Sequence, residues 1–378
     1  MREIRMVDLL GQYEKIKSEI DQAIQEVLNT TAFINGPQVK SFKENLQQYL
    51  KANHVIPCGN GTDALQIALM ALDIKKGSEI ILPAFNYVAT AEVIALLDFK
   101  PVFVDVDPDT FNINVDQIEK KITDKTAAIM AVHLFGQCAN MEKIMELAIK
   151  HDLFIIEDNA QSIGAVYTFN DGKKQTAGTI GHVGTTSFFP SKNLGCMGDG
   201  GAIYTNDGEL AETIQVMANH GQKKKYAYEL VGVNSRLDTV QAAILEVKLK
   251  NLDQYIAARQ KAAAYYDDAF KGIKEIQIPK RNSSSTHVFH QYTLKVKGIS
   301  RNELQKSLES MKIPSMIYYP SPLHLQNAYV GFGYKEGDFP VAESLCKNVI
   351  SLPMHTELDE EQLEYIVEGV NEYLNRNF

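Results

Sequence analysis

The sequence predicts an α/β protein, in which a large domain with a mainly parallel sheet flanked by helices is joined to a smaller C-terminal α+β domain. Short apolar runs alternate with amphipathic segments over the first part of the chain, which is typical of a parallel sheet covered by helices. After about residue 245 the pattern changes to one long helical stretch followed by a mixed region. We therefore expect a large domain at residues 1–245, beginning with a helical segment, and a small domain at residues 246–378.

The individual elements follow from local periodicity. Apolar residues at helical spacing predict one helix over residues 8–30 and a second over residues 37–50. The same reasoning, with β-forming runs taken as strands, gives strands at 55–58, 79–83, 101–106, 127–134, 154–158, 183–189 and 201–205, and helices at 64–72, 90–97 and 141–150. Beyond them we expect a connecting helix at 242–268, a strand at 290–296 and helices at 301–311 and 359–374.

Composition narrows the class of protein. The chain has 378 residues, of which 45% are hydrophobic and 22% charged, so it can bury a full-sized core. A net charge of −9 argues against a nucleic-acid partner. The four cysteines have no paired spacing, so we expect neither a disulfide framework nor a metal site, and the location is expected to be cytoplasmic. No apolar run is long enough to span a membrane.

One lysine, Lys192, lies between an aromatic, hydroxyl-bearing segment that begins at Ser187 and a glycine-rich segment that ends at Gly201. An ammonium on a buried loop loses hydration and tends to lose its proton. The neutral amine is then a nucleophile whose usual partner is a carbonyl group. A glycine-rich surface loop with a solvated lysine fits the same segment, so these residues alone leave both interpretations open.

A strand, a glycine turn and a helix start follow one another in Cys58-Gly-Asn-Gly61-Thr62-Asp63-Ala-Leu65. Backbone N–H groups at a helix N-terminus bind phosphate, and Thr62 adds a hydroxyl. The spacing matches neither the phosphate loop of nucleotide hydrolases nor a dinucleotide fingerprint. An ordinary turn capped by Thr62 or Asp63 is the alternative.

An acidic residue, Asp158, comes directly after a buried strand. An unpaired carboxylate there is costly, and a protonated pyridine nitrogen is one cation that can pair with it. A helix N-cap is the alternative. Nearby, Gln161 can donate to a ring oxygen, and Tyr87, beyond another strand, can stack on a flat ring or belong to the core. All these segments follow strands, whose carboxyl ends hold ligands in parallel sheets, so we expect one site.

Together these motifs resemble the DegT/StrS-type nucleotide-sugar aminotransferases, which are fold-type-I enzymes dependent on pyridoxal 5′-phosphate (PLP). The match runs from Val7 to His355. The resemblance implies that Lys192 holds PLP as an internal aldimine and moves protons in ping-pong chemistry, while Asp158 pairs with the pyridine nitrogen. It implies further cofactor contacts at Gly61, Thr62 and Ser187 for the phosphate, Tyr87 and Gln161 for the ring, and Asn234 from the other subunit. The active sites would therefore lie at a homodimer interface.

The resemblance also indicates a substrate. Asn234-Ser-Arg-Leu-Asp238 resembles members that aminate a 3-keto sugar, and residues 136–139 and 220–222 resemble enzymes acting on UDP-2-acetamido-2-deoxy-3-oxo-glucuronate. The implied donor is L-glutamate, converted to 2-oxoglutarate, and the implied setting is the synthesis of surface polysaccharide or lipopolysaccharide precursors. A dTDP-linked 3-keto-6-deoxyhexose and a 4-keto nucleotide sugar are alternatives, and a non-catalytic regulator on the same fold is a remote one. Related sugar dehydratases replace the lysine by histidine, so Lys192 argues against that activity.

Three residues are expected to contact the substrate. Arg236 can bind a carboxylate or phosphate through its guanidinium fork. Tyr318 stands where relatives usually carry a histidine before Tyr-Pro, which removes a titratable group from that place. His324 follows in the same segment and is either a substrate ligand or a structural histidine.

Overall fold

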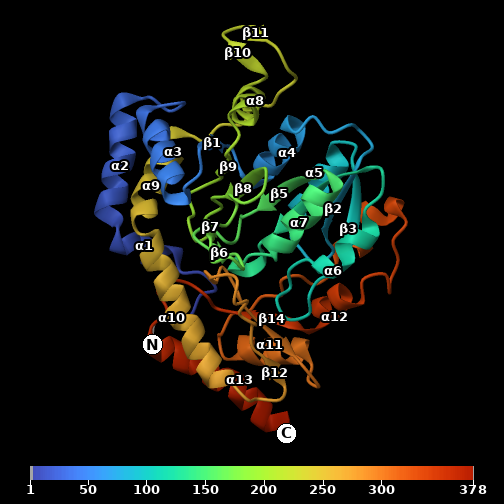
Figure 1. Ribbon diagram of the computed structural model, residues 1–378. Helices are drawn as coiled ribbons and strands as arrows, with labels where there is room; N and C mark the ends of the chain where they lie inside the picture. Colours follow the sequence, from blue (N-terminus) through green and yellow to red (C-terminus); the bar gives the residue numbers. More distant parts are fainter. Residues whose placement is uncertain (1–2, 378) are drawn as a thin grey trace.

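The computed structural model describes residues 3–377, and a seven-stranded sheet lies at the centre of the molecule (Figure 1). The strand order is β1-β9-β8-β5-β4-β2-β3. Only β9 runs antiparallel to its neighbours, which confirms the predicted mainly parallel sheet. The strands are β1 (His54–Cys58), β2 (Glu79–Pro83), β3 (Lys100–Val104), β4 (Thr126–Val132), β5 (Phe154–Asp158), β8 (Val183–Ser187) and β9 (Gly201–Thr205).

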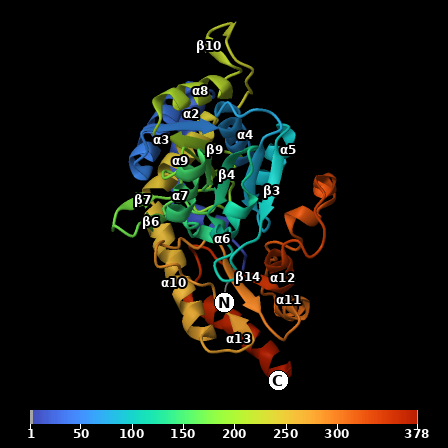
Figure 2. The same ribbon diagram turned by 45° about the vertical axis from the view of Figure 1, so that its right-hand side comes forward.

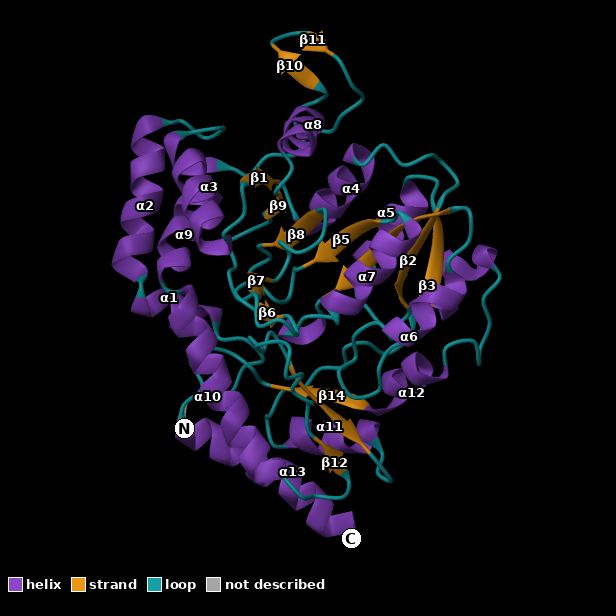
Figure 3. Ribbon diagram, viewed as in Figure 1, coloured by secondary structure: helices purple, strands orange, loops and turns teal. Residues whose placement is uncertain are grey.

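Helices cover both faces of this sheet (Figure 3). Side chains alternate along each strand, so Leu82 of β2 belongs to one apolar cluster and Ile81 to the cluster on the other face. Because both faces are buried, the strands need the continuous apolar runs seen in the sequence. The helical segments here are α3 (Pro37–Leu50), α4 (Gly61–Ala71), α5 (Ala89–Leu96), α6 (Val115–Ile118), η1 (Glu119–Lys121), η2 (Leu134–Gly136), α7 (Met141–His151) and α8 (Gly208–Ala218).

Two helices predicted as continuous are each broken in two. The segment expected at 8–30 forms α1 (Leu9–Lys15) and α2 (Lys17–Thr30), because Ile16 leaves helical geometry (φ −120°, ψ 19°) and buries its side chain with Ile244 and Val247. The segment expected at 242–268 forms α9 (Thr239–Lys250) and α10 (Leu252–Phe270). Here Asn251 donates from its side chain to the Val247 carbonyl (3.0 Å), and such side-chain bonds compete with the helical ladder.

The C-terminal part contains a three-stranded antiparallel sheet beside α10 (Figures 1 and 2). Its apolar core also takes in Ile4, while Tyr329 and Leu345 pack into a cluster of the large sheet. The expected boundary at residue 245 lies inside α9 rather than in a loop. The division into domains at residues 1–245 and 246–378 therefore stays a proposal. The elements are β12 (Ile276–Gln277), β13 (Tyr292–Val296), α11 (Arg301–Ser310), η3 (Leu323–Leu325), η4 (Asn327–Phe332), α12 (Pro340–Asn348), β14 (Val349–Leu352) and α13 (Glu360–Asn377).

Two small hairpins were not predicted. One pairs β6 (Val166–Thr168) with β7 (Lys174–Thr176), and the other pairs β10 (Gln222–Lys224) with β11 (Ala227–Tyr228). The second projects from the body of the molecule beyond α8 (Figures 1 and 2). Among residues 3–377, every helix is too short or too polar to cross a bilayer, and no three His, Cys, Asp or Glu side chains gather as a metal site.

Candidate active site

The carboxyl ends of the central strands bring the predicted site together. Strands β4, β5 and β8 run parallel, with Asp158 of β5 paired to Val132 on one side and Thr185 on the other. Since parallel strands end at the same edge of a sheet, Asp158 lies beside Ser187, which ends β8. The turn from β1 into α4 begins directly after Cys58, and the segment with Tyr87 follows β2.

Lys192 and Asp158 lie close enough to act on each other electrostatically. Lys192 is half-buried in the loop after β8, where its backbone N–H donates to the Phe189 carbonyl at 2.8 Å. Burial lowers the pKa of Lys192 to about 8, and the negative charge of Asp158 opposes this shift. Burial raises the pKa of Asp158, while the Ala160 N–H (3.0 Å to Oδ1) and Lys192 oppose that shift. The two side chains therefore face one site.

The lowered pKa of Lys192 has a measurable consequence. At pH 7 a pKa of about 8 leaves about one amine in ten uncharged, against fewer than about one in a thousand for an ordinary lysine. We expect Lys192 in cofactor-free protein to react with trinitrobenzenesulfonate with a midpoint near pH 8, as followed by peptide mapping. Reactivity rises with pH because only the neutral amine attacks. A midpoint at the value of an ordinary lysine would contradict this burial.

The start of α4 lies against Ser187, and we call this place the Gly61 cradle. Asn60 caps this helix by accepting from the Asp63 N–H (2.8 Å), which leaves the N–H groups of Gly61 and Thr62 for another acceptor. A Cβ added to Gly61 would lie 2.6 Å from Cβ of Ser187, so only glycine permits this close approach. The cradle thus brings together Gly61, Thr62 and Ser187, the three residues that the family resemblance implies for the phosphate.

Filling this cradle should weaken anion binding. We expect Gly61→Ala to reduce PLP affinity by about tenfold or more, because the added methyl group forces the turn and Ser187 apart. The measurement is a PLP titration of the cofactor-free protein, followed by absorbance. Gly331→Ala is the matched control, since a Cβ there meets no atom within 4 Å. Equal affinities of the two variants would show that the cradle does not hold the phosphate.

Aromatic and amide groups flank the same region. Tyr87 is 56% exposed, and its ring centroid lies 6.3 Å from that of Tyr319. Gln161 accepts from the Phe135 N–H (2.7 Å) and donates to the Tyr319 hydroxyl (3.1 Å), so one amide hydrogen is left for a ligand. Tyr319 was missed by the sequence analysis, although it adjoins Tyr318 in a segment already singled out.

The structure also places the remaining predicted residues, which are His324, Asn234, Tyr318 and Arg236. His324 is fully buried, with Nε2 3.1 Å from Oε1 of Glu343 and its ring edge against Phe339, which is a structural arrangement. These contacts favour the structural one of the two alternatives for His324. Asn234 is exposed. Tyr318 is half-buried, with a pKa raised by burial and its ring 6.0 Å from that of Tyr319.

Arg236 borders a separate space. It lines a cavity of about 280 Å³ between α3 and α8, together with Lys40 and Lys43. Its Nη1 lies 3.5 Å from Oδ1 of Asn219. Neither Lys192 nor Asp158 lines this cavity. Within one chain, then, Arg236 and the Lys192 site do not share a pocket.

Comparison with known proteins gives the family, since residues 14–371 match the DegT/DnrJ/EryC1/StrS aminotransferase family. The chain belongs to this family. A pleiotropic regulatory protein of Geobacillus stearothermophilus is 48% identical over 372 residues, which cover 98% of each chain. The UDP-2-acetamido-2-deoxy-3-oxo-D-glucuronate aminotransferase of Pseudomonas aeruginosa is 45% identical over 363 residues, covering 96% of this chain and 98% of the relative. The solved structure of S. venezuelae DesV, in complex with a ketimine intermediate, has a TM-score of 0.94 at 37% identity and covers 99% of each chain.

These matches confirm the fold-type-I class and the PLP-dependent aminotransferase chemistry expected from the sequence. The site also fits the cofactor on its own geometry. It offers a cradle that a Cβ would fill, an amine whose pKa burial lowers to about 8, and a buried carboxylate beside that amine. When bound, PLP supplies an electron sink for bond breaking at the carbon that carries the amino group.

Proposed function

We propose that this aminotransferase moves an amino group from L-glutamate to the 3-keto group of a nucleotide-linked sugar, with UDP-2-acetamido-2-deoxy-3-oxo-glucuronate as the first candidate. The observation that carries the proposal is that Lys192 and Asp158 lie within electrostatic reach of each other, near the Gly61 cradle. The relative of 45% identity that acts on this sugar supports the choice of substrate. The setting we propose is cytoplasmic synthesis of surface polysaccharide or lipopolysaccharide precursors.

Each residue has a proposed task. Lys192 Nζ holds the cofactor and then moves a proton between donor and acceptor carbons, for which an amine with a pKa of about 8 is suited. Asp158 keeps the ring nitrogen protonated. Tyr87 covers the ring and Gln161 donates its remaining amide hydrogen to the ring oxygen. The proposed phosphate ligands are the cradle residues described above.

The test is an assay of the purified holoenzyme with L-glutamate and a panel of keto sugars. The expected products are 2-oxoglutarate and a sugar in which an amino group replaces the 3-keto oxygen, as detected by mass spectrometry. Preference for a dTDP-linked 3-keto-6-deoxyhexose or for a 4-keto sugar would overturn the substrate but keep the reaction. No turnover with any member of the panel would favour the regulatory role suggested by the name of the Geobacillus relative.

We also propose that two copies complete each site. Large apolar side chains are exposed near it, among them Tyr87 (56%) and Phe189 (52%), and a second copy would cover them. In that arrangement the partner's Asn234 reaches the phosphate, and Arg236 reaches the substrate. Mixing the inactive Lys192→Ala and Asn234→Asp variants should restore activity, because one hybrid site then has both wild-type residues. Persistent inactivity of the mixture would place Asn234 outside the partner's site.

A further inference from the structure

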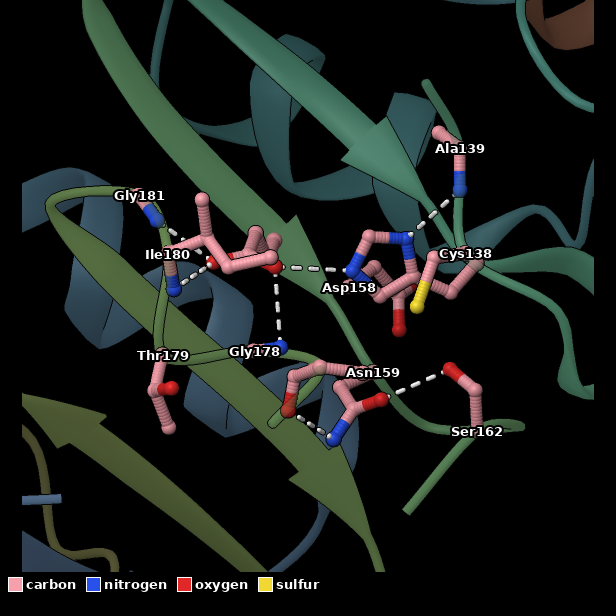
Figure 4. A network of polar contacts seen from close by, with 12 residues as sticks. Cys138, Ala139, Asp158, Asn159, Ser162, Gly178, Thr179, Ile180 and Gly181 are labelled. Atoms are coloured by element: carbon pink, nitrogen blue, oxygen red, sulfur yellow. Dashed lines mark hydrogen bonds and ion pairs between the residues drawn. The ribbon is translucent and has the colours of Figure 1, made fainter. Parts of the chain in front are cut away.

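A second buried carboxylate, Glu157, immediately precedes Asp158 on β5. It is fully buried and accepts hydrogen bonds at both oxygens from a turn whose residues 178–181 are labelled in Figure 4. Oε1 accepts from the N–H groups of Ile180 (2.7 Å) and Gly181 (2.6 Å), and Oε2 accepts from the N–H of Gly178 (2.8 Å). The remaining contact is His133, whose Nε2 lies 2.8 Å from Oε2. We call Glu157, His133 and the 178–181 backbone the Glu157 clamp.

The hydrogen-bond partners of Glu157 and His133 determine which ring nitrogen of His133 carries a proton. Three backbone N–H groups can only donate, so the Glu157 oxygens accept from all of them. The Nδ1 atom of His133 accepts from the Ala139 N–H at 3.2 Å and therefore carries no proton. The single imidazole proton is then on Nε2, where it donates to Glu157. His133 is thus a neutral imidazole in one tautomer.

The clamp is coupled directly to Asp158. The backbone N–H of His133 donates to the Asp158 carbonyl at 3.1 Å, and Glu157 is its neighbour in the chain. A positive charge on His133 would lie close enough to Asp158 to lower the pKa of that carboxylate. A protonated His133 would offer Asp158 a second cation, but it would also set its Nδ1–H against the Ala139 N–H. The clamp therefore excludes this competitor.

We propose that Glu157 and His133 are positioning residues, which hold Asp158 in place and keep its negative charge free for the ring nitrogen of the cofactor. The proposal rests on the proposed role of Asp158. It goes beyond that role because it gives a task to Glu157 and His133, which are not among the proposed cofactor contacts. Glu157 needs both His133 and the 178–181 backbone as donors, since a buried carboxylate that loses its donors destabilises the fold.

The experiment compares two buried Glu–His pairs in the same molecule. Glu343 likewise accepts from backbone N–H groups, at Gly337 (2.8 Å) and Phe339 (3.3 Å), and from His324 (3.1 Å), but it lies outside the Lys192 site. We expect Glu157→Gln to weaken PLP binding by about 10- to 100-fold, the range typical of residues that orient a ligating group. We expect Glu343→Gln to change PLP affinity by less than about twofold, although both variants lose thermal stability.

A second readout separates positioning from general destabilisation. In cofactor-free protein, Glu157→Gln should lower the midpoint of Lys192 modification below about pH 8, because a displaced or neutralised Asp158 no longer raises the pKa of Lys192. Glu343→Gln should leave that midpoint unchanged. Equal PLP affinities and equal midpoints in the two variants would overturn the proposal. Neither readout uses a sugar, so failure of the proposed substrate is distinguished from failure of this inference.

A measurement on the unmodified protein tests the proposal even if the Glu157→Gln variant does not fold. Nitrogen-15 NMR of histidine-labelled protein should show His133 as the neutral form protonated at Nε2 at pH 7. An imidazolium signal for His133 would overturn the proposal. The same spectrum in the PLP-bound enzyme should show this tautomer as well, since every hydrogen bond of the clamp lies within the protein.

Discussion

Replacing Lys192 by alanine is expected to lower kcat for amino transfer by at least about 10⁴-fold. The variant loses the nucleophile that binds the cofactor covalently and the base that moves the proton, and each contribution is large. The half-buried loop offers the cofactor an amine with a pKa of about 8, and alanine leaves no proton carrier at that atom. The measurement is release of 2-oxoglutarate from L-glutamate at saturating PLP.

The molecule provides a matched control for this variant. Lys248 on α9 is also buried (4% exposed), and burial lowers its pKa to about 8 as well. Lys248→Met should retain amino transfer, because a lysine with a lowered pKa can take part in the reaction only if it lies in the site with Asp158. Borohydride reduction of the wild-type holoenzyme followed by peptide mapping should attach the cofactor to Lys192. Attachment to any other lysine, or turnover by Lys192→Ala, would contradict the assignment.

The parts of the site that local sequence predicts are those at strand ends. Asp158, Ser187 and Gly61 each adjoin a strand whose apolar run is visible in the sequence, and a parallel sheet brings such ends together without further information. The same applies to Tyr87. A short polar motif after a buried strand therefore predicts where its residues lie in the sheet and which other residues lie near them.

Contacts between distant segments could not be predicted in this way. The sequence left His324 open between a substrate ligand and a structural histidine, because its partner Glu343 lies 19 positions along the chain and only the packing of α12 brings the two together. The Glu157 clamp joins residues 133, 157 and 178–181, and no periodicity links these segments. The helix breaks at Ile16 and Asn251 likewise depend on burial and on a side-chain hydrogen bond, which override helical propensity.

Replacing Asp158 by asparagine is expected to lower kcat by about 100- to 1,000-fold, the usual cost of one lost electrostatic partner in a buried site. Asparagine keeps the size of the side chain but removes the charge that would hold the ring nitrogen protonated. The second effect is on Lys192. The charge of Asp158 raises the pKa of Lys192 against burial, so its loss lets that pKa fall below about 8. The measurements are kcat and the pH midpoint of Lys192 modification in cofactor-free protein.

The control for Asp158→Asn is another buried aspartate at the end of a strand. Asp105 follows β3 and is 2% exposed, and its carboxylate accepts from the N–H groups of Val341 (2.9 Å) and Ala342 (2.8 Å). Asp105→Asn should destabilise the fold but leave the Lys192 midpoint unchanged, because Asp105 does not contribute to the pKa shift of Lys192. A fall in kcat for Asp158→Asn with no downward shift of the midpoint would mean that Asp158 does not act on Lys192. The carboxylate and the amine would then belong to separate functions, and the electrostatic pairing on which the site is built would be lost.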